Sequence, residues 1–284
     1  MKRALAFLCA FGCGQLLAGP KFFFMPDQRF MPENKLSEFD SPLPVNITED
    51  EFETVLVGIE DFYKPLVKDL YGADLSVVRD WSDPTVNAYA TQSGTAWEIH
   101  MYGGLARRPE ITPDGFALVA CHEMGHHLGG FPYVQSWAAN EGQSDYFGTL
   151  SCARQLWKDE SVKNEAAGAK IPAYPKKLCD DSWKGADDRH LCYRVALAGK
   201  SLADLLSGGS AKYETPSRSV VSATNNAHPA GQCRLDTYLA GAICHAEFDK
   251  DSIPKSERDS AKVSCLQSRS EKGFRPRCWF KPSI

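Results

Sequence analysis

Several common features are absent from this sequence of 284 residues. It has no block of basic residues, and 32 Lys and Arg against 36 Asp and Glu leave a net charge of −4, so nucleic acid is not an expected partner. No CxxC pair is present, which argues against a structural zinc site. Beyond the N-terminus no apolar run is long enough to span a bilayer, so no transmembrane segment is expected there. Without an internal repeat, the length suits one domain with elaborations or two small domains.

The N-terminus is typical of an export signal. Lys2 and Arg3 precede an apolar stretch over residues 4–18 that is too short to span a bilayer comfortably. We therefore expect a signal peptide over residues 1–18 and an exported protein, periplasmic or secreted. A lipid anchor at Cys13 is the less favoured alternative, because the usual aliphatic residue three places before an acylated cysteine is missing.

The most informative segment is His122-Glu123-Met124-Gly125-His126, which follows an apolar run that predicts a helix. Residues 112–113 supply a Thr N-cap and a first-turn proline, and two glycines at 129–130 end the pattern. Histidines four apart lie on one face of a helix and can bind one zinc ion. Glu123 is placed to take a proton from a zinc-bound water. This combination is typical of a zinc peptidase.

A zinc site of this kind needs a third protein ligand. Metzincins use a histidine six residues after the second one, but Pro132 occupies that position here. Glu141 is the better candidate, and Asp145 lies one turn further along the same face of a predicted helix. We expect Asp145 to accept the outer N–H of a ligand imidazole. His127 points about 100° away from His126 and is not expected to share the metal.

These residues resemble the gluzincin pattern of thermolysin-like proteases, in which HExxH is followed by the motif seen here as Asn140-Glu141-x-x-Ser144-Asp145. Three further segments resemble HtpX-like and CAAX-prenyl-protease-like metallopeptidases, namely residues 86–90, 101–106 and 228–234. The resemblance covers roughly residues 50–248. It departs from that branch in lacking transmembrane helices after the N-terminus and in its thermolysin-like third-ligand motif. It therefore implies a soluble gluzincin.

The resemblance implies an α+β, mainly helical zincin-type domain, with a small antiparallel or mixed sheet before the zinc helix. In gluzincins the strand nearest that helix offers its free edge to an extended substrate. By analogy the expected edge strand is 97–102, with Trp97, Ile99, Met101 and Tyr102. An ordinary internal strand is the alternative.

Periodicity predicts helices opening at the capping box of residues 48–51 and running over about 136–157, 189–206 and 231–247, with a loop over 169–188. We divide the chain into a signal peptide (1–18), an N-terminal extension that can cover the cleft (19–47), a gluzincin-like catalytic domain (48–250) and a disulfide-tethered tail (251–284).

Eight cysteines follow the leader, an even number that predicts disulfides in an exported chain. We expect Cys179 to pair with Cys192, and Cys121 with Cys152 across the two zinc helices. Two others, 233 and 244, lie on one predicted helix about 16 Å apart and cannot pair with each other. The remaining pairs therefore join Cys233 and Cys244 to Cys265 and Cys278, in an order that the sequence leaves open.

The expected mechanism uses one zinc ion held by His122, His126 and Glu141, with Glu123 as general base. The resemblance makes His228 and Arg234 candidates for stabilising the oxyanion. Their alternatives are a capping histidine and a structural Arg–carboxylate pair, or a His228 that fills the open zinc position at rest. The expected function is a monomeric endopeptidase acting on peptide or unfolded protein. A catalytically silent zinc protein that binds peptide in the same groove, or a cell-wall peptide hydrolase, is the alternative.

Overall fold

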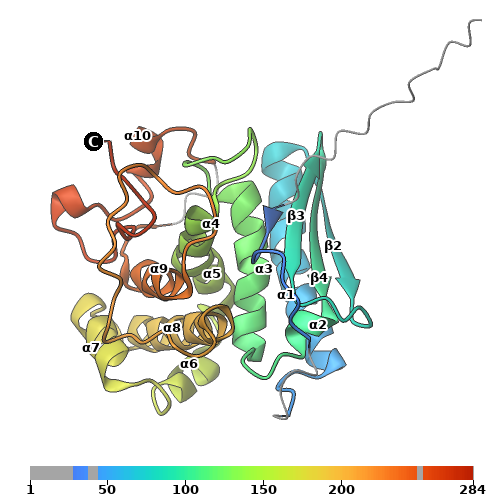
Figure 1. The fold of residues 1–284 in the computed structure, drawn as a ribbon, viewed down its shortest axis with the longest axis horizontal. Coiled ribbons are helices and arrows are strands. Elements are labelled where there is room, and N and C mark those ends of the chain that lie inside the picture. The colour runs from blue at the N-terminus through green and yellow to red at the C-terminus, as the bar shows by residue number, and fades with distance from the viewer. Residues whose placement is uncertain (1–27, 38–43, 248–251, 284) are drawn as a thin grey trace, which may run out of the picture.

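The computed structural model describes residues 28–37, 44–247 and 252–283. The predicted signal peptide, the lipid-anchor alternative at Cys13 and the first part of the extension lie outside these residues. The described chain is α+β, with helices predominating over one four-stranded mixed sheet, and it carries four disulfides (Figure 1). None of the described helices is long and apolar enough to cross a membrane.

The strands are short and the helices vary widely in length. The strands are β1 (Gln28–Arg29), β2 (Asp74–Asp80), β3 (Ala88–Ser93) and β4 (Ala96–Tyr102). The helices are α1 (Glu49–Tyr71), α2 (Gly103–Ala106), α3 (Pro113–Leu128), α4 (Glu141–Phe147), α5 (Ala153–Trp157), α6 (Ser161–Ala167), α7 (Ala173–Ser182), α8 (Ala186–Ser207), α9 (Gly231–Ile243) and α10 (Glu257–Ser260). A π-helical turn, Gly148–Cys152, joins α4 to α5.

The sheet has the strand order β1-β3-β4-β2, so β4 is an internal strand. It pairs in parallel with β2 and antiparallel with β3, whose far edge is covered by β1. The prediction that Trp97, Ile99, Met101 and Tyr102 form the free edge is therefore wrong, and the internal-strand alternative is correct. Alternating apolar residues report which face of a strand is buried, and they carry no information on how many neighbours it has.

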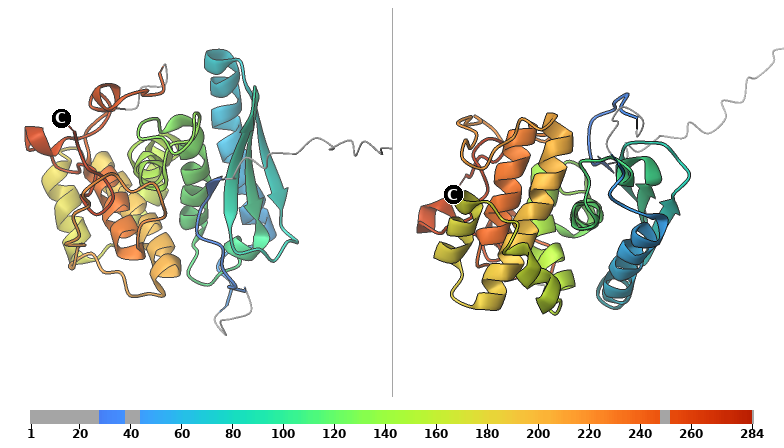
Figure 2. Two further views of the ribbon diagram at one scale, coloured as in Figure 1. Left: turned by 45° about the horizontal axis from the view of Figure 1, so that its top comes forward. Right: turned by 90° about the horizontal axis from the view of Figure 1, so that it is seen from below.

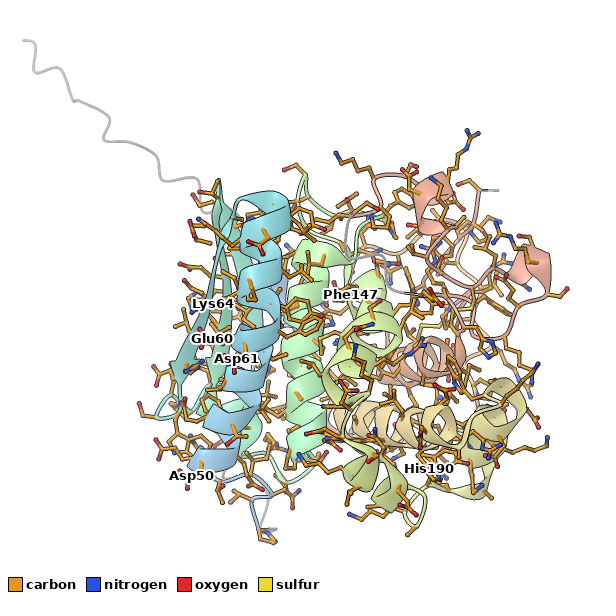
Figure 3. The ribbon with its side chains drawn as sticks, turned by 180° about the vertical axis from the view of Figure 1, so that it is seen from behind. Asp50, Glu60, Asp61, Lys64, Phe147 and His190 are labelled. Atoms are coloured by element: carbon orange, nitrogen blue, oxygen red, sulfur yellow. A yellow bond between two sulfur atoms is a disulfide. The ribbon has the colours of Figure 1, made fainter. Side chains whose placement is uncertain are left out.

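Helices α1 and α3 cover one face of the sheet, and the other helices lie beyond α3 (Figures 1 and 2). The capping box at Thr48 and Glu51 opens α1 as predicted. Figure 3 shows α1 in front of the sheet, where Lys64 forms an ion pair with Glu60 at 2.6 Å. The alternating residues of β2, β3 and β4 that face these helices are buried.

Helix α3 is the central helix of the molecule. Thr112 caps its start by accepting a hydrogen bond from the Gly115 amide at 3.0 Å, and Pro113 is its first residue, both as predicted. Every residue from Gly115 to Leu128 is buried. Gly130 turns the chain away with a φ of 71°, a conformation that favours glycine. The helix thus carries the HExxH segment through the interior between the sheet and the other helices.

The boundaries of the later helices differ from the sequence prediction. The predicted helix over 136–157 begins only at Glu141, because Asn140 caps α4 and the residues before it form a tight loop closed by a bridge between Tyr133 and Ala139. The predicted loop over 169–188 is wrong, since it contains α7. Helix α7 has few apolar residues to mark a period, and its Cys179 is joined to α8 by a disulfide.

All four disulfides agree with the predicted pairing rules. Cys121 pairs with Cys152 and Cys179 with Cys192. The order that the sequence left open is decided as Cys233 with Cys278 and Cys244 with Cys265. The last two bonds attach the C-terminal segment to both ends of α9.

Candidate metal centre

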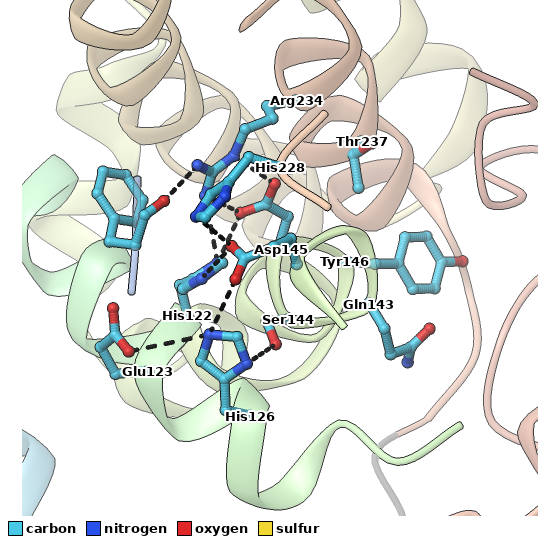
Figure 4. A network of polar contacts seen from close by, with 12 residues as sticks. His122, Glu123, His126, Gln143, Ser144, Asp145, Tyr146, His228, Arg234 and Thr237 are labelled. Atoms are coloured by element: carbon cyan, nitrogen blue, oxygen red, sulfur yellow. Dashed lines mark hydrogen bonds and ion pairs between the residues drawn. The ribbon is translucent and has the colours of Figure 1, made fainter. Parts of the chain in front are cut away.

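Three predicted ligands converge in the interior, where α3 meets α4. His122 and His126 come from α3, and Glu141 is the first residue of α4. One ligand atom from each side chain lies within 4.8 Å of those of the other two. Glu141 Oε2 is 3.3 Å from His122 Nε2, and Glu141 Oε1 is 3.7 Å from His126 Nε2. The three side chains can therefore hold one metal ion. Figure 4 shows the two histidines of this group with Asp145 and Arg234.

The outer nitrogen of each imidazole is already engaged. His122 Nδ1 lies 2.7 Å from Asp145 Oδ1, so Asp145 is placed as predicted. His126 Nδ1 lies 2.9 Å from the Ala139 carbonyl and 3.1 Å from Ser144 Oγ. These contacts direct both Nε2 atoms toward the centre of the cluster, where neither has a hydrogen-bond partner.

The local sequence explains why α4 approaches α3 so closely. Gly125 faces Ser144, and a Cβ at this glycine would lie 2.8 Å from the backbone of Ser144. The Ala139 amide donates to the His126 carbonyl at 2.9 Å, and the Asn140 side chain caps α4 through the Gln143 amide at 2.9 Å. The third ligand therefore begins its helix directly beside the second one.

Asp145 is itself held by Arg234 of α9. Arg234 donates Nε to Asp145 Oδ2 and Nη2 to Oδ1, each at 2.7 Å, and both side chains are buried. Burial raises the pKa of Asp145, but Arg234 and His122 outweigh it and lower the pKa to about 2. Burial lowers the pKa of His122, but Asp145 outweighs it and raises the pKa to about 9. Asp145 is therefore ionised throughout the neutral range.

Glu123 completes the cluster as its second carboxylate. It is fully buried, neither of its oxygens has a hydrogen-bond partner, and Oε2 lies 3.9 Å from His126 Nε2. Burial and the charge of Glu141 raise the pKa of Glu123 well above its usual range, although His122 and Arg234 oppose them.

The donor set fits a divalent cation. Burial raises the pKa of Glu141, but its contacts with His122 and His126 outweigh burial and lower the pKa, so this ligand is a carboxylate near neutral pH. Two imidazoles and one carboxylate are a set that holds zinc in catalytic sites and leaves one position open. The unpartnered Nε2 atoms and Glu141 Oε2 point to the same place.

His228 and Arg234 both reach this centre, by different routes. His228 Nε2 lies 3.4 Å from Glu141 Oε2 and is partly exposed. Arg234 has the geometry of the Arg–carboxylate pair that was its alternative interpretation, and it acts on the ligands through Asp145. Both also bind the N-terminal segment, as described below.

Two further histidines, one on α3 and one on β4, do not join the cluster. His127 lies between the rings of Trp97 and Trp137 and contacts the Glu98 carbonyl at 3.2 Å, in agreement with its predicted angle on the helix. His100 stacks on Tyr89.

Sequence reasoning missed several residues of the site. The motif that contains Ser144 predicted no role for it, and the resemblance over residues 86–90 predicted none for Asn87. Arg29 and Phe30 gave no signal, because nearly a hundred residues separate them from the nearest ligand and no motif contains them.

No family model, no curated protein and no solved structure matches this chain.

Proposed function

We propose that this chain is an exported, zinc-dependent endopeptidase of the gluzincin type. The observation that carries the proposal is the convergence of unpartnered His122 and His126 Nε2 atoms, Glu141 and an unpartnered Glu123 carboxylate in one buried site. A site that only bound metal would have no need of Glu123. Four disulfides support an oxidising compartment, periplasmic or extracellular.

The residues have distinct roles in this proposal. His122, His126 and Glu141 hold the zinc ion, which when bound supplies the Lewis acidity that makes water nucleophilic near neutral pH. Glu123 takes the proton of the attacking water and delivers it to the leaving amine. Asp145 keeps the His122 ring oriented, and Arg234 keeps Asp145 ionised.

The peptide is expected to lie along β3, in place of the incorrectly predicted β4. The outer edge of β3 is covered by only the two residues of β1. Its Ala88 and Ala90 are buried on the side that faces α3, and α3 contacts this strand. An extended chain added to this edge passes beside the ligands.

The test compares three disulfide-intact proteins on an unfolded generic protein at equal measured zinc content. Replacing Glu123 with Gln is expected to reduce the cleavage rate by about 10²–10⁴-fold, the usual contribution of a general base. Glu165→Gln, at an exposed position on α6, serves as the matched control and should cleave like the wild type.

Two outcomes count against the proposal. Equal cleavage by wild type and Glu123→Gln would show that the activity does not come from this site. Zinc-loaded proteins that never cleave, even with the N-terminal segment displaced, would favour a silent peptide-binding protein.

A further inference from the structure

The N-terminal segment, residues 28–31, lies along the edge of β3, and its first two residues form the antiparallel strand β1. Arg29 is opposite Tyr89, and the Phe30 amide donates to the Ala88 carbonyl at 3.0 Å. Asn87 then binds both backbone groups of Met31, accepting from its amide at 3.2 Å and donating to its carbonyl at 3.0 Å. All of these bonds use backbone atoms of the segment, so any extended peptide could make them.

The polar groups of the metal centre bind the two carbonyls at the middle of this segment. His228 Nε2 donates to the Arg29 carbonyl at 2.8 Å, and Arg234 Nη1 donates to the Phe30 carbonyl at 2.5 Å. His228 Nε2 also lies 3.4 Å from Glu141 Oε2. The peptide bond between Arg29 and Phe30 is thereby brought beside the ligand set.

The Phe30 side chain fills a pocket in the wall of the centre. It is fully buried, its ring meets that of His122 edge-on at 5.3 Å, and the Arg234 guanidinium lies 4.5 Å from its centroid. Arg29, by contrast, is exposed. This place therefore accommodates an aromatic side chain, which packs against both His122 and Arg234.

The segment contains no cysteine and is held against β3 by non-covalent contacts. No disulfide holds it, and a cavity of about 690 Å³ lies between residues 29–37 and residues 84–89 with Tyr102. Phe30 and Met31 supply its buried apolar contacts. The edge of β3 beneath it remains a complete row of backbone groups for another strand.

We propose that residues 28–31 occupy the place of the substrate as an internal pseudo-substrate, with Phe30 in the pocket for the residue that follows the scissile bond. This inference rests on the proposed function, because a pseudo-substrate implies an enzyme with a substrate. The binding of the segment can nevertheless be measured without catalysis. The protein's own extension then competes with any other extended peptide for the place beside the ligands, and its Phe30 side chain makes the buried contacts there.

The test measures binding of a fluorescent octapeptide with the sequence of residues 26–33 to zinc-loaded Glu123→Gln protein, by fluorescence polarisation. Phe30→Ala in the protein should raise the affinity for this peptide at least tenfold, because the tethered competitor is weakened. The same peptide with Ala in place of its Phe should bind at least tenfold more weakly. Leu36→Ala, an exposed change five residues after the segment, is the matched control and should leave the affinity unchanged.

A second arm protects the test against a Phe30→Ala protein that fails to fold. A site-specific protease sequence is inserted between residues 40 and 41, and the folded protein is nicked there. Nicking removes the tether of the segment to α1, so the octapeptide should exchange into the pocket and bind at least tenfold more tightly than before nicking. Equal binding before and after nicking, or binding that ignores the Phe of the peptide, would overturn the inference.

The outcomes separate this inference from the proposed function. Peptide binding that depends on Phe, without any cleavage of protein substrates, supports the pseudo-substrate and contradicts the proposed peptidase function. Cleavage of protein substrates together with peptide binding that does not depend on Phe supports the peptidase and contradicts the pseudo-substrate.

Discussion

At the scale of single residues, the geometry of the centre depends on the hydrogen-bond partners of the outer nitrogen atoms of its two histidines. Asp145, the Ala139 carbonyl and Ser144 engage the Nδ1 atoms of the two histidines. Only the Nε2 atoms are then free to bind a cation, and they converge with Glu141. The ligand set is thus preorganised by hydrogen bonds outside it.

Removing the third ligand tests the composition of this site. Removing a residue that only hydrogen-bonds to a metal ligand typically lowers metal affinity by about 10–100-fold. Glu141→Gln removes a ligand itself, so it should lower zinc affinity by more than about 100-fold. Competition with a chromophoric chelator measures this, with exposed Glu165→Gln as the control. Unchanged affinity in the Glu141 variant would show that the metal binds elsewhere.

The buried Asp145–Arg234 pair predicts a defined acid sensitivity. The pKa of Asp145 is about 2 in the folded protein against an ordinary value of 3.8, so the ionised form stabilises the fold. This contribution, roughly 2 kcal/mol, is fully present above about pH 4 and is lost as the pH falls through 2. Urea unfolding of the metal-free protein between pH 6 and pH 2 measures it. Asp145→Asn should show a pH dependence that is shallower by this amount, and an identical slope would contradict the assignment.

At the scale of elements, the site is the junction of α3 with α4 and the turn that follows. Gly125 lets the backbone of Ser144 approach, and the Cys121–Cys152 bond joins α3 to the π-helical turn after α4. Both features hold the ligands of two separate helices at one spacing. Replacing Gly125 or removing the disulfide is therefore expected to weaken metal binding although neither change alters a ligand.

Replacing both Cys121 and Cys152 with Ser should separate stability from metal binding. The bond closes a loop of 31 residues, so its removal should lower the free energy of unfolding by about 3–4 kcal/mol. Zinc affinity should fall as well, because the two ligand helices are no longer joined. Replacing Cys179 and Cys192 with Ser is the matched control. This disulfide closes a loop of 13 residues, so its removal should lower the free energy of unfolding by about 3 kcal/mol without changing zinc affinity. Equal effects of the two double variants on zinc binding would count against a role for the first bond at the site.

At the scale of the whole molecule, both ends of the described chain pack on the centre. The N-terminal segment places Phe30 on His122, and the C-terminal segment places the fully buried Trp279 directly on Gly142 of α4. Trp279 Nε1 also donates to Thr237 Oγ1 of α9 at 3.0 Å. The tail thus supports the helix that carries the third ligand.

Truncating this tryptophan should destabilise the whole fold. Trp279→Ala removes a fully buried aromatic side chain, and such changes typically lower the free energy of unfolding by about 3–5 kcal/mol. Lys281→Ala, an exposed change two residues later, should have an effect below about 0.5 kcal/mol. Chemical unfolding monitored by circular dichroism measures both, and a difference below 1 kcal/mol would mean that the tail does not support α4.

The sequence alone determined the parts of this protein that local spacing controls. The two candidate histidine ligands were predicted from the 3.6-residue period of a helix. The capped starts of α1 and α3 were predicted from their first residues. The distance between Cys233 and Cys244 along one predicted helix excluded a disulfide between them. Only the tertiary structure decided that β4 is internal, that α7 exists and which tail cysteine meets which end of α9. It alone placed Phe30 against His122, because contacts between residues so far apart depend on the packing of the whole chain and leave no periodic trace in the sequence.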